Sequence, residues 1–182
     1  MPDLSVVMLT VGGESCEFFQ QALATLEEHT SDDYELIVVV NDDCDRAVKL
    51  AEAYGATKVL KSTEMAGFGE GMNRGFSEVS PDAKYIVCTN DDVLFTPDWD
   101  TLLRDCLDMY HAKDPDRPQA GMVGPLTNYA GGFQMVNSPQ LNPTNCAEHA
   151  KLWAAKNALK WDAVAFISGF CFMMSREFFD ER

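Results

Sequence analysis

Basic residues are scarce in this chain of 182 residues. Lys and Arg together number 14 against 29 Asp and Glu, which gives a formal net charge of −15. Non-specific binding to DNA or RNA requires clustered Lys and Arg, and the sequence contains no such cluster. We therefore expect no nucleic-acid partner, and we expect a strongly anionic ligand to bind through a metal ion.

Long hydrophobic runs and paired cysteines are also missing. The longest apolar stretch, AVAFISGFCFMM at 163–174, is well short of the ~20 residues that span a bilayer. The opening MPDLSVVMLT lacks the basic start and the cleavage site of a signal peptide. The six cysteines form no Cys-x-x-Cys pair and no zinc-binding spacing. We expect a cytoplasmic protein with reduced thiols and no transmembrane segment.

The glycine patterns typical of nucleotide binding are absent too. No Gly-x-x-x-x-Gly-Lys-Ser/Thr loop occurs, and MAGFGEGMNRGF has Met72 where a dinucleotide fingerprint needs glycine. What remains is a flexible loop that enters a helix, whose N-terminus is able to face a phosphate, with Arg74 one turn further on.

What the sequence does contain is an alternation of two patterns. Short apolar runs rich in β-branched residues predict strands at 4–9, 36–40, 57–60 and 85–88. Apolar residues at helical spacing predict helices at 14–29, 47–54, 68–79 and from Pro97 to Tyr110. Strand and helix in alternation predict an α/β fold, with a mostly parallel central sheet and helices on both faces.

The pattern changes beyond Asp114. A polar connection precedes two short strands expected within 120–136, and a loop and a helix are expected within 142–160. A last strand over 163–175 is expected to break at Ser168-Gly169. We therefore expect mixed strands in the C-terminal part. A length of 182 residues suits a single domain, 1–182.

Two of the expected strands end in the same three residues. One is followed by Asn41–Asp43 and the other by Asn90–Asp92, both reading Asn-Asp-Asp. In an open parallel sheet ligands bind beyond the carboxyl ends of the strands, so both trios are expected on one edge. Crowded carboxylates repel one another unless solvent or a cation intervenes, and Asp and Asn oxygens suit Mg²⁺ or Mn²⁺. Turn formation is the alternative explanation, because Asn and Asp are common in turns.

The order of these motifs resembles the family 2 glycosyltransferases, which have the Rossmann-like GT-A fold. The likeness runs from Leu4 to about Phe179 and rests on LSVVMLT, LIVVVNDD, AGFGEGMNRGF, YIVCTNDDVLFTPDW, GMVGP and ISGFCFMMSREFF. These enzymes transfer a sugar from a nucleotide diphosphate to an acceptor hydroxyl, usually with inversion and a divalent metal. The resemblance implies a hexosyltransferase-like enzyme with a nucleotide-binding half at 1–112 and an acceptor-side half at 113–182. The implied donor is a UDP-, dTDP- or GDP-linked sugar, and the acceptor is a glycan, a lipid or a protein.

The resemblance also implies roles for individual residues. Asp92 matches the metal-binding position of the family's Asp-x-Asp site, and the implied ion, Mg²⁺ or Mn²⁺, bridges the two donor phosphates. The family's base-binding aspartate falls on either Asn41 or Asp42, and Met65 departs from the asparagine that the family has before the glycine loop. The residues implied in nucleotide-sugar binding are Thr10, Asn41, Asp42, Gly67, Arg74, Asn90, Asp91, Ser168 and Gly169.

No residue of this sequence is assigned as the catalytic base. In the family the base lies in an acidic pair after a glycine-containing turn, beyond the segment that matches SREFFDER, and this sequence stops at Arg182. The expectation is a fragment, a base from another residue or chain, or a non-catalytic nucleotide-sugar-binding module. A sugar-phosphate nucleotidyltransferase is a further alternative, although that class has a basic, glycine-rich first loop and TVGGESCEFF contains no Lys or Arg.

Overall fold

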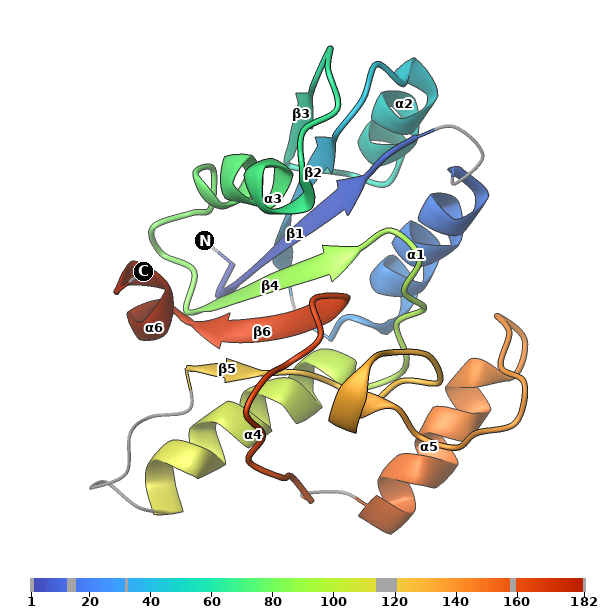
Figure 1. The fold of residues 1–182 in the computed structure, drawn as a ribbon, viewed down its shortest axis with the longest axis vertical. Coiled ribbons are helices and arrows are strands. Elements are labelled where there is room, and N and C mark those ends of the chain that lie inside the picture. The colour runs from blue at the N-terminus through green and yellow to red at the C-terminus, as the bar shows by residue number, and fades with distance from the viewer. Residues whose placement is uncertain (1, 13–15, 32, 114–120, 158–159, 182) are drawn as a thin grey trace.

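The computed structural model describes residues 2–12, 16–31, 33–113, 121–157 and 160–181, and the side chains of 110–113 are not described. A six-stranded sheet runs through the molecule in the order β3-β2-β1-β4-β6-β5 (Figure 1). The strands are β1 Leu4–Thr10, β2 Tyr34–Val40, β3 Lys58–Lys61, β4 Tyr85–Asn90, β5 Met122–Val123 and β6 Cys171–Ser175. Strands β1 to β4 are parallel, whereas β6 is antiparallel to both β4 and β5. This architecture confirms the α/β fold with mixed strands in the C-terminal part.

Helices cover both faces of the sheet (Figure 1). They are α1 Cys16–His29, α2 Asp45–Ala53, α3 Phe68–Phe76, α4 Trp99–Lys113, α5 Cys146–Asn157 and α6 Arg176–Asp180, with a short 3₁₀ helix, η2, at Gly132–Gln134. Alternate side chains of β1 point to opposite faces, as the pleat requires. Leu4, Val6 and Met8 share a core with α1, α2 and α4, and Val7 and Leu9 share a second core with α3.

Two glycines allow α3 to lie close to the sheet. A Cβ atom at Gly71 would overlap Cδ1 of Leu9, and one at Gly75 would overlap Cγ1 of Val7 and lie 2.9 Å from Cγ2 of Val39. The two glycines are four residues apart and therefore lie on one face of the helix. Packing thus explains part of the glycine-rich segment without any ligand.

Several expected elements differ from the structure, and the helix expected over 68–79 ends at Phe76. The helix expected from Pro97 begins at Trp99, because Asp98 takes a left-handed backbone conformation (φ 64°). The two strands expected within 120–136 are reduced to the two residues of β5 and an isolated bridge between Thr127 and Met135. The last strand begins only at Cys171, because residues 163–166 are exposed and pair with no strand in the described parts of the chain.

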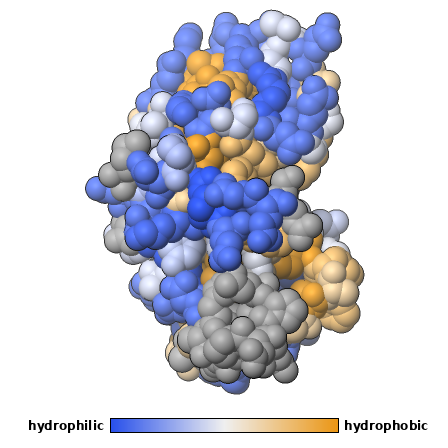
Figure 2. Space-filling model, turned by 90° about the vertical axis from the view of Figure 1, so that its left-hand side faces the viewer, coloured by the Kyte–Doolittle hydropathy of each residue, from blue (hydrophilic) through white to orange (hydrophobic). Residues whose placement is uncertain are grey.

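The surface agrees with the acidic composition. Figure 2 shows a largely hydrophilic face with a few exposed apolar areas. No described helix is long and apolar enough to cross a membrane. All six cysteines are free, and four of them, Cys16, Cys88, Cys146 and Cys171, are buried.

Candidate functional site

The carboxyl ends of β1, β2 and β4 lie side by side at one edge of the sheet (Figure 1). The strand register pairs Thr10 with Val40 and Leu9 with Asn90. The backbone N–H of Asn41 also donates to the carbonyl oxygen of Thr10 at 2.8 Å, one residue beyond the strand. Both Asn-Asp-Asp trios therefore begin at the same edge of the sheet, which we call the donor edge after the sugar donor that the sequence resemblance implies.

Thr10 connects the loop after β1 with the acidic loop after β4. Its side chain is fully buried, and its Oγ1 donates a hydrogen bond of 2.5 Å to Oδ2 of Asp91. The same oxygen accepts from the backbone N–H of Gly12 at 3.3 Å. A hydroxyl that donates to a carboxylate makes a strong, charge-assisted hydrogen bond. The position of the Asp91 carboxylate is therefore fixed by β1.

Asn41 is buried and its side-chain amide is paired with the backbone of Ala66. Nδ2 of Asn41 donates to the Ala66 carbonyl oxygen at 2.7 Å, and the Ala66 N–H donates to Oδ1 of Asn41 at 3.2 Å. Asn41 therefore joins the end of β2 to the loop that precedes α3. Sequence alone could not reveal this pairing, because it joins residues in different loops.

Asp42 differs from Asn41 because one of its carboxylate oxygens has no hydrogen-bond partner among the described residues. Its Oδ1 is buried and accepts no hydrogen bond from any described residue. Burial raises the pKa of Asp42 above its usual value, and the neighbouring Asp43 carboxylate raises it further. An unsatisfied buried acceptor is a group that a ligand N–H or O–H is able to satisfy. Of the two positions expected to meet the base, Asp42 has the available acceptor.

Gly12 provides the space beside Asp42. Its backbone is left-handed, with φ at 58°, and a Cβ atom there would lie 2.8 Å from each carboxylate oxygen of Asp42. Such a Cβ atom would also overlap Cβ of Cys44. The loop after β1 therefore reaches Asp42 so closely that only glycine fits.

Asp43 and Arg74 both contact Lys61, the last residue of β3, beside the donor edge. Nζ of Lys61 lies 2.5 Å from Oδ1 of Asp43 and 2.6 Å from Oδ1 of Asp45, and these two hydrogen-bonded carboxylates raise the pKa of Lys61. The Arg74 guanidinium donates to Oγ of Ser62 and, at 3.4 Å, to the carbonyl oxygen of Lys61. Arg74 thus holds the loop after β3, and its nucleotide-binding role stays a prediction.

The segment that contains Ser168 and Gly169 reaches the donor edge from the C-terminal part of the chain. The backbone N–H of Asn90 donates to the carbonyl oxygen of Phe170 at 2.8 Å. A Cβ atom on Gly169 would lie 3.7 Å from Cε1 of Phe68, the first residue of α3 after Gly67. The segment therefore lies between the acidic loop and the start of α3.

The residues at this edge fit a metal ion that is shared with a ligand. The described residues contain no group of three or more His, Cys, Asp or Glu that could enclose an ion. Mg²⁺, however, is usually held by one or two carboxylates, with water and substrate phosphates as the remaining ligands. Asp92 is exposed and directly follows Asp91, whose carboxylate Thr10 holds, so the Asp92 carboxylate suits such an open site.

Gln134 is a residue that sequence analysis missed. It is buried, with only 6% of its surface exposed, and its amide joins the loop after β5 to the segment before β6. Its neighbours Phe133 and Met135 are exposed, and no periodicity marks the position as buried. Only the tertiary contacts identify it.

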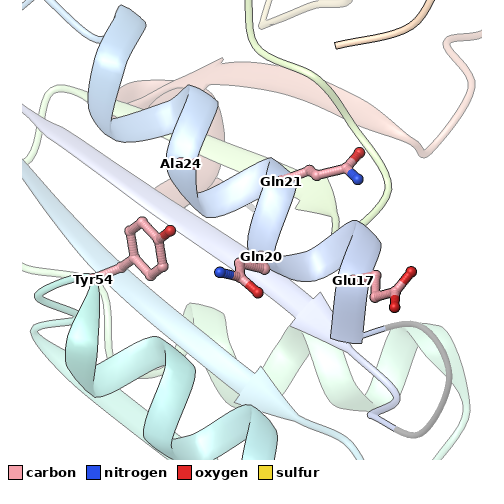
Figure 3. Close-up of a pocket in the computed structure, with 5 residues that line it drawn as sticks. All are labelled: Glu17, Gln20, Gln21, Ala24 and Tyr54. Carbon is pink, nitrogen blue, oxygen red and sulfur yellow. The ribbon is translucent and has the colours of Figure 1, made fainter.

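A separate hollow lies between α1 and α2. It has a volume of about 320 Å³ and is lined by Glu17, Gln20, Gln21, Ala24 and Tyr54. In Figure 3 the ring of Tyr54 faces α1 across this hollow. No residue of the predicted site lines it, so it is not part of the donor edge.

The fold is of the GT-A type. The chain belongs to the glycosyl transferase family 2, whose family model matches residues 5–182. No curated protein matches the chain.

Two solved structures illustrate the shared fold. The mannosyltransferase PcManGT from Pyrobaculum calidifontis, in complex with GDP-Man and Mn²⁺, matches with a TM-score of 0.60 and 18% identity, over 99% of this chain and 46% of that chain. TarS 1-349 from S. aureus, in complex with UDP-GlcNAc, matches with a TM-score of 0.58 and 15% identity, over 76% of this chain and 37% of that chain. The chain therefore spans less than half the length of these proteins.

Proposed function

We propose that this chain binds a nucleotide-diphosphate sugar at the donor edge and transfers the sugar to an acceptor hydroxyl in a metal-dependent reaction. The observation that carries the proposal is the hydrogen bond from Thr10 to Asp91, which brings the ends of β1 and β4 together. Family membership supports the transferase class, and the nucleotide-sugar complexes of PcManGT and TarS support the choice of donor. UDP-, GDP- and dTDP-sugars are the candidate donors.

Each part of the donor has a proposed binding group. Oδ1 of Asp42, which has no hydrogen-bond partner among the described residues, accepts an N–H of the base. The N-terminus of α3, after Gly67, faces the phosphates, because its free backbone N–H groups and the helix dipole favour anions. Asp91 binds the ribose or the sugar from the position that Thr10 fixes. Ser168 and Gly169 lie under the donor sugar.

Asp92 is the proposed metal ligand, with Mg²⁺ or Mn²⁺ as the ion. The bound ion would supply Lewis-acid stabilisation of the charge that develops on the departing nucleotide diphosphate. It would also offset the repulsion between a polyanionic donor and a chain with a net charge of −15. The free, buried thiols support a cytoplasmic location, which cell fractionation would test.

Thermal-shift titration tests donor and metal binding. UDP, GDP and dTDP are each added with and without Mn²⁺, and we expect at least one of them to stabilise the chain only when Mn²⁺ is present. The Asp92→Ala variant should lose this metal dependence and keep its melting temperature without ligand, because Asp92 is exposed. Asp105→Ala, which removes an exposed carboxylate on α4, is the matched control. Equal Mn²⁺-dependent stabilisation of the Asp92→Ala variant and the control would rule out the metal role of Asp92.

A turnover assay then separates the classes of activity. The nucleotide sugar that stabilises the chain is incubated with candidate acceptors, and free nucleotide diphosphate is measured. Release supports the transferase. Stabilisation without release would indicate a nucleotide-sugar-binding module, and pyrophosphate formed from a nucleoside triphosphate and a sugar phosphate would indicate a nucleotidyltransferase.

A further inference from the structure

Gln134 connects three segments of the C-terminal part. Its Nε2 donates to the carbonyl oxygen of Pro125 at 2.9 Å, and its Oε1 accepts from the backbone N–H of Ser168. Gln134 itself lies at the end of η2. One buried amide therefore links the loop after β5, the 3₁₀ helix and the segment before β6. A buried amide that is paired at both ends has a fixed orientation, because any rotation would leave a buried polar group unpaired.

Gly124 makes room for this amide. A Cβ atom at Gly124 would lie 2.6 Å from Nε2 of Gln134 and 2.5 Å from Cγ2 of Ile167. The amide therefore packs directly against the backbone that follows β5. This close packing restricts Gln134 to the rotamer that reaches Ser168.

The segment from Ser168 to Phe170 is held at two points. At one end the N–H of Asn90 donates to the carbonyl oxygen of Phe170, next to the acidic loop. At the other end the N–H of Ser168 donates to Gln134. Sheet pairing begins only at Cys171, so the hydrogen bond to Gln134 fixes the part of the segment that the sheet does not hold.

Building on the proposed function, we propose that Gln134 is a positioning residue for the donor sugar. It does not touch the ligand, but holds Ser168 and Gly169 at a fixed place relative to Asn90 and Asp91, so that this segment contacts the sugar. The nucleotide is bound by other parts of the donor edge, at Asp42 and at the start of α3. Loss of the Gln134 amide should therefore weaken the contribution of the sugar to donor affinity and leave nucleotide affinity unchanged.

Calorimetric titration of two ligands tests this role. The ligands are the nucleotide diphosphate that stabilises the wild type and the corresponding nucleotide sugar, both with Mn²⁺. Gln134→Met keeps the side-chain length and removes both hydrogen bonds. We expect it to raise the Kd of the nucleotide sugar about three- to tenfold, which corresponds to the net contribution of about one hydrogen bond to binding. The Kd of the nucleotide diphosphate should change by less than about twofold.

Two further variants complete the experiment. Gln134→Asn keeps a buried amide on a side chain one methylene shorter, which is unable to reach Pro125 and Ser168 together, so its nucleotide-sugar Kd should fall between the wild type and Gln134→Met. If Gln134→Met does not fold, the comparison of the two ligands is made on Gln134→Asn. Gln140→Met, an exposed glutamine in the same part of the chain, is the control and should behave as the wild type.

The outcomes separate this inference from the proposed function. Equal weakening of both ligands, or no change in either, would overturn the positioning role of Gln134. A wild-type chain that binds neither ligand would overturn the proposed function, and the inference with it. A selective loss of nucleotide-sugar affinity is not expected from general destabilisation, which would affect both ligands.

Discussion

The Oγ1 hydroxyl of Thr10 donates a hydrogen bond of 2.5 Å to Oδ2 of Asp91, across 81 positions of sequence. Thr10 ends β1, and Asp91 directly follows β4, the strand beside it. The contact therefore fixes the distance between the first loop of the donor edge and the loop that carries the proposed metal ligand. A strand end is rigid, so Asp91 is held in place before any ligand binds.

Thr10→Val removes this hydrogen bond and keeps the shape of the side chain. We expect the free energy of unfolding to fall by about 1–2 kcal/mol, because the half-buried Asp91 carboxylate loses a donor. Donor affinity should fall as well, since Asp91 loses the contact that orients its carboxylate relative to β1. Urea denaturation and calorimetric titration measure the two effects.

Thr10→Ser is the control for this prediction, because it keeps the hydroxyl and loses only a methyl group. It should retain most of the donor affinity. If Thr10→Ser and Thr10→Val reduce donor affinity equally, the hydrogen bond to Asp91 is not the cause.

Asp42→Asn should raise the thermal stability of the chain at neutral pH. It should also reduce nucleotide affinity, because the proposed acceptor for the base is no longer a carboxylate. Burial raises the pKa of Asp42 in the folded chain, so the folded state favours the protonated carboxyl. The stability of the wild type therefore falls as the pH rises through the folded pKa, whereas the neutral amide has no such loss. We expect the variant to melt at a higher temperature than the wild type at pH 7.

The pH dependence of the difference in stability between the variant and the wild type tests this prediction most directly. The difference in melting temperature between the variant and the wild type should shrink on acidification and disappear below about pH 4, where Asp is protonated in the unfolded chain as well. A difference that stays constant between pH 3 and pH 8 would show that ionisation of Asp42 is not involved. Asp105→Asn, at an exposed position, controls for the general effect of removing a charge.

Two glycines of α3 should respond in opposite directions to alanine. A Cβ atom at Gly75 would overlap Val7 and lie 2.9 Å from Cγ2 of Val39, so Gly75→Ala should lower the free energy of unfolding by about 1–3 kcal/mol. Gly69 has no atom within 4 Å of the same position, so Gly69→Ala should raise the free energy of unfolding by about 0.5–1 kcal/mol through helix propensity. Chemical denaturation measures both effects. If Gly69→Ala lowered the free energy of unfolding, the position would not have the open space that the structure shows.

Gly12→Ala should be more harmful than Gly55→Ala, although both glycines have a left-handed backbone, with φ at 58° and 72°. Gly55 has open space around it, so alanine there carries only the conformational cost of about 1–2 kcal/mol. Alanine at Gly12 also meets the Asp42 carboxylate and Cys44. We expect Gly12→Ala to lose nucleotide binding and Gly55→Ala to keep it, as measured by thermal shift with nucleotide and Mn²⁺. Equal loss in both variants would contradict a role for the space beside Asp42.

The sheet and the donor edge could be predicted because both depend on local sequence patterns. β-branched apolar runs predicted the four parallel strands, and the carboxyl ends of parallel strands must share one edge. The pairing of Asn41 with Ala66 and the burial of Gln134 could not be predicted, because each depends on contacts between distant segments. Residues 163–166 were expected in a strand because they are largely apolar, but the structure shows them exposed. Apolar composition therefore did not predict burial in this segment.

The antiparallel direction of β6 has a consequence for biosynthesis. The four parallel strands are complete once β4 has been made, yet the free side of β4 has no neighbour until Cys171–Ser175 emerges from the ribosome. An uncovered strand edge of this kind attracts other chains. The nascent polypeptide is therefore exposed to self-association until β6 pairs with β4, and the same step delivers Ser168 and Gly169 to the acidic loop.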